Sequence, residues 1–322
     1  MNQPERRRRF VIALGGNAIL PAGKRGTYAE QAEITRQTMD QVALIAAAGH
    51  EIVMTHGNGP VVGNIVLRGD AGEQIHGIPA MPMFVCGAES EGGIGFLIQQ
   101  SLQNALRGAK VDRAVATIVT QVTVDASDPA FAKPTKPIGP FYAEDQARVL
   151  ERENGWTVVQ DSGRGWRRVV PSPRPIEVVE WRAIKALLDA GIVAVAVGGG
   201  GVPVVRLANG DLEGVDAVID KDHASALLGQ LVQADTLVII TQIDKVFVRF
   251  GQPDAEALDV LPADRARKLL AAGEFPSGSM GPKIEAALNF LAHGGREVII
   301  TDPTSILPSI RGESGTRVVP AA

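Results

Sequence analysis

The chain has 322 residues, of which 45% are hydrophobic and 21% are charged, and its formal net charge is −4. This composition is typical of a globular protein with a substantial core, in one large domain or two modest ones, and excludes extended disorder. The sequence lacks a run of about 18 uncharged apolar residues, which argues against a membrane span, and its net negative charge argues against a general nucleic-acid binder.

The chain opens with a basic run, Arg6–Arg9, followed by the apolar residues Phe10–Leu14. This order faintly resembles an export signal, but the apolar run ends at Gly15 and no small-residue cleavage site follows it. The single cysteine, Cys86, cannot form a disulfide within the chain and is expected to be a small buried hydrophobe. We therefore expect a cytoplasmic protein.

Strands and helices are expected to alternate along most of the chain, with glycine-rich loops between them. Strands are expected at residues 10–14, 51–55, 114–120, 192–197, 236–240 and 297–301. Helices are expected at residues 27–48, 60–66, 89–106, 178–188, 221–231 and 282–293. The alternation predicts an α/β fold in which a parallel or mostly parallel sheet lies between layers of helices.

The segment from residue 125 to residue 175 breaks this pattern, because it is rich in Pro, Gly, Lys, Arg and Trp. It is too long for a plain connection in a compact domain, which favours a functional insertion or lid. The alternative is an ordinary excursion of the chain with a small core of its own. Regular alternation returns after it, with a hairpin expected at residues 204–212 around the turn Asn209-Gly210.

Three glycine clusters follow expected strands: Gly15–Asn17, Gly57–Gly59 and Gly198–Gly201. Ligands of open α/β sheets bind beyond the carboxyl ends of the strands. Glycine lets the backbone approach an anion closely and direct several N–H groups at it. One such cluster could serve only a tight turn, but three at one edge of the sheet predict an anion site, with phosphate as the expected anion.

The common nucleotide-binding fingerprints and several other catalytic signatures are absent from the sequence. Lys24 is followed by Arg25 and lacks the upstream glycine of a P-loop, and the glycine after Gly57 and Gly59 comes at Gly63, one residue too late for the dinucleotide-binding motif. The histidines are scattered and no paired cysteines occur, so a built-in zinc site is not expected. No G-x-S-x-G nucleophile motif is present.

Two lysines stand at expected helix starts. Lys221 begins the helix at residues 221–231, and Lys283 follows Pro282, which marks a first helical position. A lysine has the wrong charge for a helix N-terminus, so the pair is explained if an anion lies between the two helix ends. Asp222 would orient a catalytic lysine or help to place a metal, and Lys136 in the insertion is a third candidate cation. Phosphoryl transfer needs such positive charge around the transferred group.

Eight segments of the sequence carry a resemblance to a known family. They are ALGGNAI at 13–19, HGNGP at 56–60, TQV at 120–122, KPTKPIGPF at 133–141, GRGWRRVVPSP at 163–173, GGGGVP at 198–203, VIDKD at 218–222 and GSMGPKIE at 278–285. With these segments the chain resembles the carbamate kinases of the amino-acid kinase family. The resemblance runs from residue 10 to about residue 300, and so covers nearly the whole chain.

The resemblance implies an α/β protein built as a three-layer αβα sandwich with a mostly parallel central sheet and a small protruding subdomain. The whole chain, residues 1–322, would be one domain of the amino-acid kinase type, with the subdomain inserted at residues 125–175. The implied activity is reversible, Mg²⁺-dependent phosphoryl transfer between ATP and carbamate, which gives ADP and carbamoyl phosphate. The implied role is ATP formation in arginine breakdown, and the implied assembly is a homodimer.

Site residues are carried over by position. The resemblance implies that Lys221 and Lys283 stabilise the phosphoryl group in transfer, that Asp222 organises these lysines, and that Lys136 reaches in from the protruding subdomain. The residues implied for the phosphate and carbamoyl groups are Gly15, Gly16, Asn17, Gly57, Asn58 and Gly59. The residues implied for ATP or ADP are Gly199, Gly200, Thr241, Ile243, Asp244, Val246 and Ser279. No residue is implied as a direct metal ligand.

Two positions depart from the family pattern. Val61 stands where the family commonly has glutamine, close enough to the substrate loop to bear on substrate affinity. The segment Glu89–Glu91 stands where glutamine-rich versions are common, and we expect its acidity at a helix start to be locally harmless.

Two other functions stay open at this point. The first keeps the fold but changes the acceptor of the phosphoryl group to acetylglutamate, aspartate or glutamate. The second is a nucleotide-binding sensor that has lost turnover.

Overall fold

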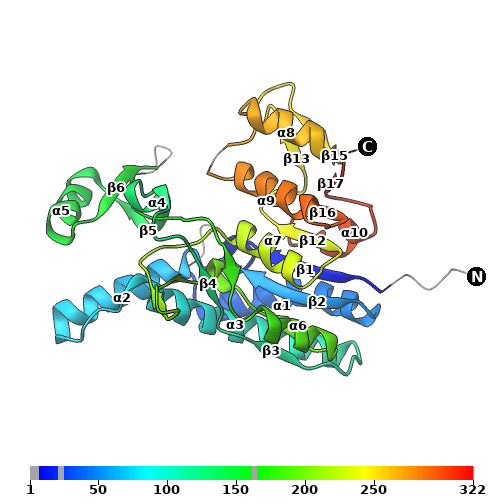
Figure 1. The fold of residues 1–322 in the computed structure, drawn as a ribbon, viewed down its shortest axis with the longest axis horizontal. Helices are drawn as coiled ribbons and strands as arrows, with labels where there is room; N and C mark the ends of the chain where they lie inside the picture. The colour runs from blue at the N-terminus through cyan, green and yellow to red at the C-terminus, as the bar shows by residue number, and fades with distance from the viewer. Residues whose placement is uncertain (1–6, 21–24, 162–164, 277, 322) are drawn as a thin grey trace, which may run out of the picture.

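The computed structural model describes residues 7–20, 25–161, 165–276 and 278–321 (Figure 1). Arg6, Lys24, Gly163 and Arg164 lie outside these residues, and of Asn17 only the backbone is described. Within the described residues, no helix has both the length and the apolar character needed to cross a bilayer.

An eight-stranded sheet forms the centre of the molecule. Its strands, in spatial order, are β15 (Val260–Pro262), β17 (Thr316–Val319), β16 (Glu297–Thr301), β12 (Thr236–Ile240), β1 (Arg9–Leu14), β2 (Glu51–His56), β9 (Val193–Val195) and β3 (Val115–Thr117). Neighbouring strands are parallel except for β16 and β17, which are antiparallel. The predicted mostly parallel sheet is therefore confirmed.

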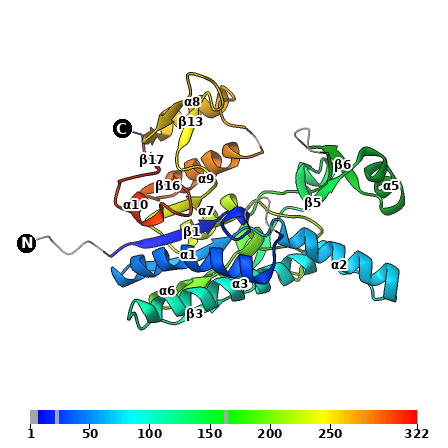
Figure 2. The same cartoon turned by 180° about the vertical axis from the view of Figure 1, so that it is seen from behind.

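Helices cover both faces of this sheet, as Figures 1 and 2 show from opposite sides. One face carries α1 (Tyr28–Ala47), α3 (Met83–Gly108) and α10 (Ile306–Ile310), and the other carries α6 (Trp181–Asp189), α7 (Lys221–Leu231) and α9 (Met280–Ala292). The central strand β1 alternates between the two layers. Phe10, Ile12 and Leu14 pack with the α1 and α3 side, whereas Val11 and Ala13 pack with the α7 and α9 side. This confirms the three-layer αβα sandwich.

Smaller units surround the sandwich. A four-stranded sheet contains β11 (Leu212–Gly214), β10 (Val202–Arg206), β4 (Gln121–Thr123) and β8 (Glu177–Val178). A hairpin of β13 (Val246–Val248) and β14 (Glu256–Leu258) precedes α8 (Ala263–Ala271), and α2 (Val61–His76) precedes α3. Two short 3₁₀ turns, η1 (Gly16–Ala18) and η2 (Gly198–Gly200), follow β1 and β9.

Residues 125–175 form a unit with its own sheet. It contains α4 (Pro129–Ala132), β5 (Lys136–Tyr142), α5 (Glu144–Asn154), β6 (Thr157–Gln160) and β7 (Trp166–Val170). The strands pair antiparallel in the order β5-β7-β6. In Figure 1 this sheet stands away from the central sheet, on the side opposite α8. That residues 125–175 act as a lid stays a prediction.

Some predicted boundaries were wrong. The strand expected at residues 114–120 is β3 and ends at Thr117, and the chain then enters the separate strand β4. Helix α9 begins at Met280, so Pro282 is its third residue and not its first. A proline is still tolerated there, because the first-turn N–H groups of a helix have no partner within it.

Candidate active site

Most of the predicted site residues gather at one edge of the central sheet. Strands β1, β2 and β12 are parallel neighbours, so the loops that follow Leu14, His56 and Ile240 leave from the same edge. These loops line a cavity of about 670 Å³. The residues of the prediction that line it are Gly15, Gly16, Gly57, Asn58, Gly59, Lys136, Gly199, Lys221, Asp222, Thr241, Ser279 and Lys283.

Two of the glycine loops touch each other. A Cβ atom on Gly16 would lie 2.1 Å from the carbonyl oxygen of Gly59, and one on Gly15 would lie 2.8 Å from that of Ile240. Contacts this short exclude any side chain at these two positions. The glycines of the first cluster are therefore required by the close approach of the β1 loop to its neighbours.

The first residues of helix α7 line the cavity, and an aspartate caps the start of this helix. Asp220 Oδ1 accepts hydrogen bonds from the backbone N–H groups of Asp222, at 2.9 Å, and His223, at 3.4 Å. This cap fixes Lys221 as the first helical residue, as predicted. The side chains of Lys221 and Asp222 are only 11% and 3% exposed.

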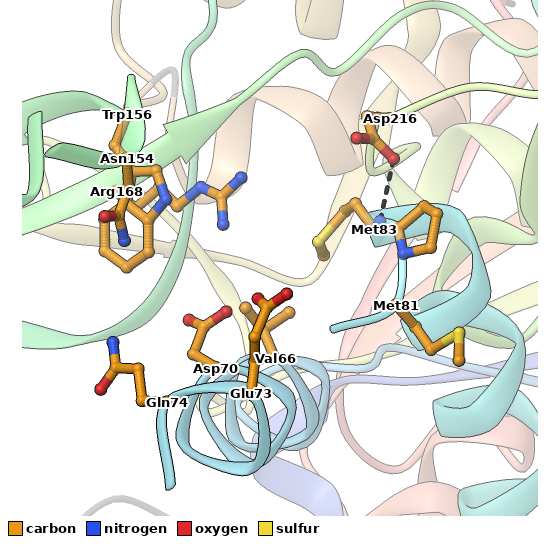
Figure 3. Close-up of a pocket in the computed structure, with 11 residues that line it drawn as sticks. Val66, Asp70, Glu73, Gln74, Met81, Met83, Asn154, Trp156, Arg168 and Asp216 are labelled. Atoms are coloured by element: carbon orange, nitrogen blue, oxygen red, sulfur yellow. Dashed lines mark hydrogen bonds between the residues drawn. The ribbon is translucent and has the colours of Figure 1, made fainter. Parts of the chain in front are cut away.

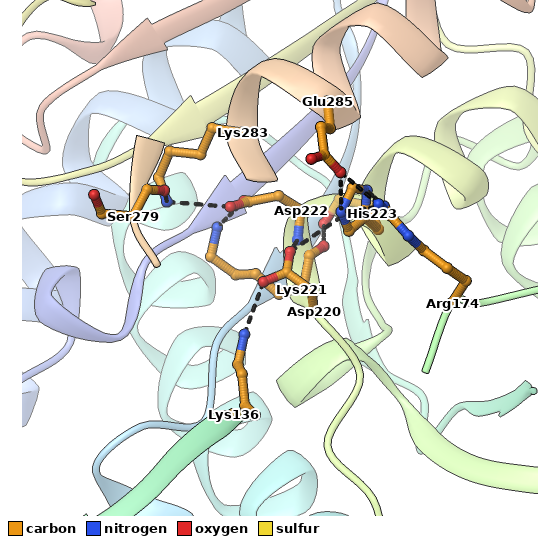
Figure 4. A network of polar contacts seen from close by, with 10 residues as sticks. Lys136, Arg174, Asp220, Lys221, Asp222, His223, Ser279, Lys283 and Glu285 are labelled. Carbon is orange, nitrogen blue, oxygen red and sulfur yellow. Dashed lines mark hydrogen bonds and ion pairs between the residues drawn. The ribbon is translucent and has the colours of Figure 1, made fainter. Parts of the chain in front are cut away.

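Lys221 and Lys283 meet at one carboxylate, as Figure 4 shows. Asp222 forms an ion pair with Lys221 through Oδ1, and its Oδ2 lies 3.2 Å from Lys283 Nζ. Lys283 also donates to the backbone carbonyl of Ser279 at 3.2 Å. The two helix-start lysines therefore share one cavity, and an acid of the chain lies between them.

The third lysine reaches the cavity from the inserted unit. Lys136, the first residue of β5, forms an ion pair with Asp220, with 2.7 Å between Nζ and Oδ2 (Figure 4). The sequence prediction did not include Asp220. Its signal was available, because an aspartate directly before a predicted helix is the usual cap. Asp220 thus joins the inserted unit to the start of α7.

Burial and ion pairing shift the pKa values of these groups in opposite directions. Burial lowers the pKa of Lys221 below its ordinary value, although the Asp222 carboxylate opposes that shift. Burial also disfavours ionisation of Asp222 and Asp220, but the lysines outweigh it and hold the pKa of both carboxyls below their ordinary values. Lys136 is the main partner in the case of Asp220. Both acids are therefore ionised near neutral pH.

Arg167 lines the same cavity and was not predicted. It comes from β7, lies 3.2 Å from Asp161 through Nη1 and stands over the ring of Phe141, with 5.1 Å between the guanidinium carbon and the ring centre. Its Nε is buried and lacks a hydrogen-bond partner among the residues described. The only sequence signal was its place in one of the family segments.

Four residues predicted for the nucleotide do not line this cavity: Gly200, Ile243, Asp244 and Val246. Val246 is fully buried in the core, and its backbone N–H donates to Thr316 Oγ1 at 2.8 Å. That these four residues contact a nucleotide stays a prediction. The predicted substrate contact of Asn17 also stays a prediction. So does the effect of Val61 on substrate affinity; its side chain packs against the core near α1 and α3.

The interpretation of Glu91 as a harmless acid at a helix start was wrong. Helix α3 begins earlier than predicted, at Met83, so Glu91 lies well inside it and is only 1% exposed. Its carboxyl group accepts two backbone N–H groups, from Thr120 at 3.0 Å and from Gly198 at 2.6 Å. The prediction failed because the helix boundary was misplaced.

A second cavity, of about 330 Å³, lies between α2, the start of α3 and the inserted sheet (Figure 3). Arg168 of β7 lies in it opposite Asp70 and Asp216, and stacks on Trp156 with 4.7 Å between the guanidinium carbon and the ring centre. None of the predicted site residues is among the described residues that line this second cavity. The predicted site therefore corresponds to the larger cavity alone.

The larger cavity is suited to an anion. Three ammonium groups and the guanidinium of Arg167 face or border it, against the carboxylates of Asp220 and Asp222. Within the described part of the chain, no three His, Cys, Asp or Glu side chains are close enough to hold a metal ion. Positive charge and glycine backbone at the end of a parallel sheet are the chemistry expected for binding phosphate groups.

Comparison with known proteins shows the family to which the chain is similar. A sequence profile described as the amino acid kinase family matches residues 8–302. The carbamate kinase of Pyrococcus horikoshii is 49% identical over 312 residues, covering 97% of this chain and 99% of the relative. The carbamate kinase-like protein YahI of Escherichia coli is 47% identical over 310 residues, or 96% and 98% of the two chains. The solved carbamate kinase of Giardia lamblia bound to AMP-PNP has a TM-score of 0.90 and 40% identity, covering 98% of this chain and 99% of that one.

Proposed function

The chain belongs to the carbamate kinases of the amino acid kinase family and is a phosphotransferase, and from this premise we propose that it transfers a phosphoryl group between ATP and carbamate. The products in that direction are ADP and carbamoyl phosphate. The observation that carries the proposal is the meeting of Lys136, Lys221 and Lys283 in one cavity, beside the glycine loops that follow β1 and β2.

The lysines supply what this reaction needs. A phosphoryl group in transfer carries negative charge on three oxygens, and the protein stabilises it mainly by placing positive charge around it. Lys221 and Lys283 perform this role in the proposed mechanism. Asp222 keeps both side chains in place through its two carboxylate oxygens, so they are organised before the substrate binds.

Lys136 adds a charge from the inserted unit. Its ion pair with Asp220 holds the side chain at the edge of the cavity, where it is 34% exposed and able to approach a bound anion. We propose that the unit at residues 125–175 works as a lid which carries Lys136 and Arg167 onto the substrate. Both residues already line the cavity from β5 and β7.

In this proposal, different loops bind different parts of the substrates. The glycine loops at residues 15–17 and 57–59 would bind the phosphate and the carbamoyl group through backbone N–H groups. The loop after β12, with Thr241, Ile243, Asp244 and Val246, would flank the adenosine together with Gly199, Gly200 and Ser279. The similarity to the Giardia carbamate kinase bound to AMP-PNP supports the binding of an adenine nucleotide.

We also propose that Mg²⁺ is required. Mg²⁺ commonly reaches kinase sites on the phosphates of the nucleotide and keeps several of its waters. The two acids of the cavity, Asp220 and Asp222, are both ion-paired with lysines. This fits an ion held chiefly by phosphate oxygens, and such an ion would neutralise charge on the nucleotide.

The physiological setting is proposed from the resemblance alone. It favours ATP formation during arginine breakdown, a homodimeric assembly and a cytoplasmic location. Sedimentation equilibrium tests the assembly, since a dimer has twice the mass of the 33.9 kDa chain.

The decisive assay follows ATP formation from ADP and carbamoyl phosphate with Mg²⁺, read by coupled luminescence. The proposal expects ATP in proportion to enzyme, and loss of ATP when carbamoyl phosphate is left out. Phosphorylation of acetylglutamate, aspartate or glutamate without ATP formation would instead indicate another acceptor. Tight ADP binding without turnover of any of these substrates would indicate a sensor.

A further inference from the structure

The glycine turn that follows β9 is closed by two backbone hydrogen bonds, from Gly200 N–H to the Val197 carbonyl at 3.2 Å and from Gly201 N–H to the Gly198 carbonyl at 2.9 Å. Gly199, Gly200 and Gly201 have φ angles of 67°, 95° and 86°, in the left-handed region that glycine adopts most readily. The turn carries no side chains that could anchor it, and glycine backbone is the most flexible. Beyond its two backbone hydrogen bonds, the conformation of the turn therefore depends on the groups packed around it.

The turn touches both sides of the proposed active site. A Cβ atom on Gly199 would lie 2.5 Å from Asn58 Nδ2, and one on Gly200 would lie 2.4 Å from the carbonyl oxygen of Ile219. Ile219 directly precedes Asp220, which caps α7 and holds Lys136. A shift of the turn would therefore move both the β2 loop and the base of the lysine cluster.

Glu91 holds the start of this turn from inside helix α3. Its Oε1 accepts the backbone N–H of Gly198 at 2.6 Å, and its Oε2 accepts that of Thr120 at 3.0 Å. Thr120 in turn holds the residues that flank the turn. Its hydroxyl accepts a hydrogen bond from the N–H of Val197 at 3.0 Å, and its carbonyl accepts one from the N–H of Val202 at 2.8 Å. The Glu91 carboxyl group and Thr120 together thus hold the chain on both sides of the turn.

We propose that Glu91 is a positioning residue of this enzyme: it orders the glycine turn at residues 198–201 and, through that turn, places Asn58 and the start of α7 for phosphoryl transfer. The proposal rests on the proposed function for its kinetic consequence. Its structural consequence, an ordered turn, does not depend on the substrate. Glu91 itself does not line the cavity, so it acts only through the groups that it holds.

The ionisation of Glu91 gives the proposal a second testable consequence, a dependence on pH. Burial raises the pKa of Glu91 to about 8, although the backbone N–H groups of Thr120 and Gly198 oppose that shift. The titratable groups that face it are Glu180, which raises its pKa, and His56, whose own pKa burial lowers to about 4. Lys221 also lowers the pKa of His56. An ionised carboxylate accepts both N–H groups, whereas a protonated one has less acceptor capacity.

The test compares Glu91→Ala and Glu91→Gln with Ser90→Ala. Ser90 is an equally buried neighbour on α3, but its hydroxyl bonds to Gly87 within the helix and does not reach the turn. Above pH 8, where the carboxyl group is ionised, we expect Glu91→Ala to lower kcat for ATP formation at least about tenfold, the scale of one lost charged hydrogen bond. Glu91→Gln should recover part of this loss through its one amide oxygen, and Ser90→Ala should stay near the wild type. The wild-type kcat should rise with pH through about 8, and this rise should be absent in Glu91→Gln.

Amide hydrogen exchange over residues 196–202 provides a readout without turnover. We expect exchange there to be at least about tenfold faster in Glu91→Ala than in Ser90→Ala. If Glu91→Ala fails to fold, Glu91→Gln, which keeps the shape of the side chain, is compared in its place. Wild-type exchange and kcat in the folded variant would overturn the inference, as would an equal loss in Ser90→Ala. A wild-type protein that forms no ATP overturns the proposed function instead, and exchange then decides on Glu91.

Discussion

Asp222 is the residue whose replacement tests the lysine cluster most sharply. Its two carboxylate oxygens engage Lys221 and Lys283, and its side chain is only 3% exposed. The substitution Asp222→Asn keeps the shape of the side chain and removes its charge. Two buried ammonium groups then face each other without the carboxylate between them.

The size of the effect follows from these contacts. Opposite unit charges about 3 Å apart attract by about 5–6 kcal/mol at an effective dielectric constant of about 20. Desolvation offsets much of this, but removing one member of a buried pair still costs about 3–5 kcal/mol, because the other charge stays buried. We therefore expect lower stability and a kcat at least about 100-fold lower, the usual scale for a disturbed preorganised charge.

The pH dependence of kcat gives the same variant a specific signature. Burial already lowers the pKa of Lys221, and Asp222 opposes that shift. Without the carboxylate the pKa falls further, so the alkaline limb of the profile should move to lower pH by at least about one unit, which corresponds to about 1.4 kcal/mol. The matched control is Asp40→Asn, which removes an exposed partner of Arg36 on α1. A folded Asp222→Asn enzyme with wild-type kcat and an unmoved alkaline limb would refute this reasoning.

Three further predictions concern the same cavity. Lys283→Ala is expected to lower the rate of ATP formation at least about 100-fold, with Lys185→Ala unchanged, and a near-wild-type rate would remove Lys283 from the mechanism. Lys136→Met leaves Asp220 partly buried without its lysine partner, so the pKa of Asp220 rises. The difference in Tm from the wild type should be largest near neutral pH and shrink as the pH falls below about 4, whereas a pH-independent difference would contradict the pairing. Chelation of Mg²⁺ with EDTA should abolish turnover and restored Mg²⁺ should recover it, so full turnover in EDTA would contradict the proposed metal requirement.

The sequence predicted the core of the fold well, because apolar runs and glycine punctuation are local signals. Strands β12 and β16 have the predicted bounds, and so does helix α7, which an aspartate caps at its start. The edge of the sheet was missed. Strands β15 and β17 are short, and β17 runs antiparallel to β16, so they are defined by pairing with distant residues and not by a pattern of their own.

The prediction that two lysines share one cavity is confirmed, but the reason given for it was incomplete. The wrong-sign charge of Lys221 and Lys283 at helix starts led to one shared cavity, which the structure contains. Part of the explanation is Asp222, which lies between them, and not an anion alone. Asp220, Glu91 and Arg167 contribute through contacts with residues far away in sequence, and single-residue patterns do not carry that information.

A crystal structure of the protein with ADP and Mg²⁺ tests the role of the two lysines most directly. We expect the β-phosphate in the 670 Å³ cavity, with its oxygens at hydrogen-bond distance, about 3 Å, from the Nζ atoms of Lys221 and Lys283. Phosphates bound elsewhere on the chain, with both lysines engaged only by Asp222, would contradict it.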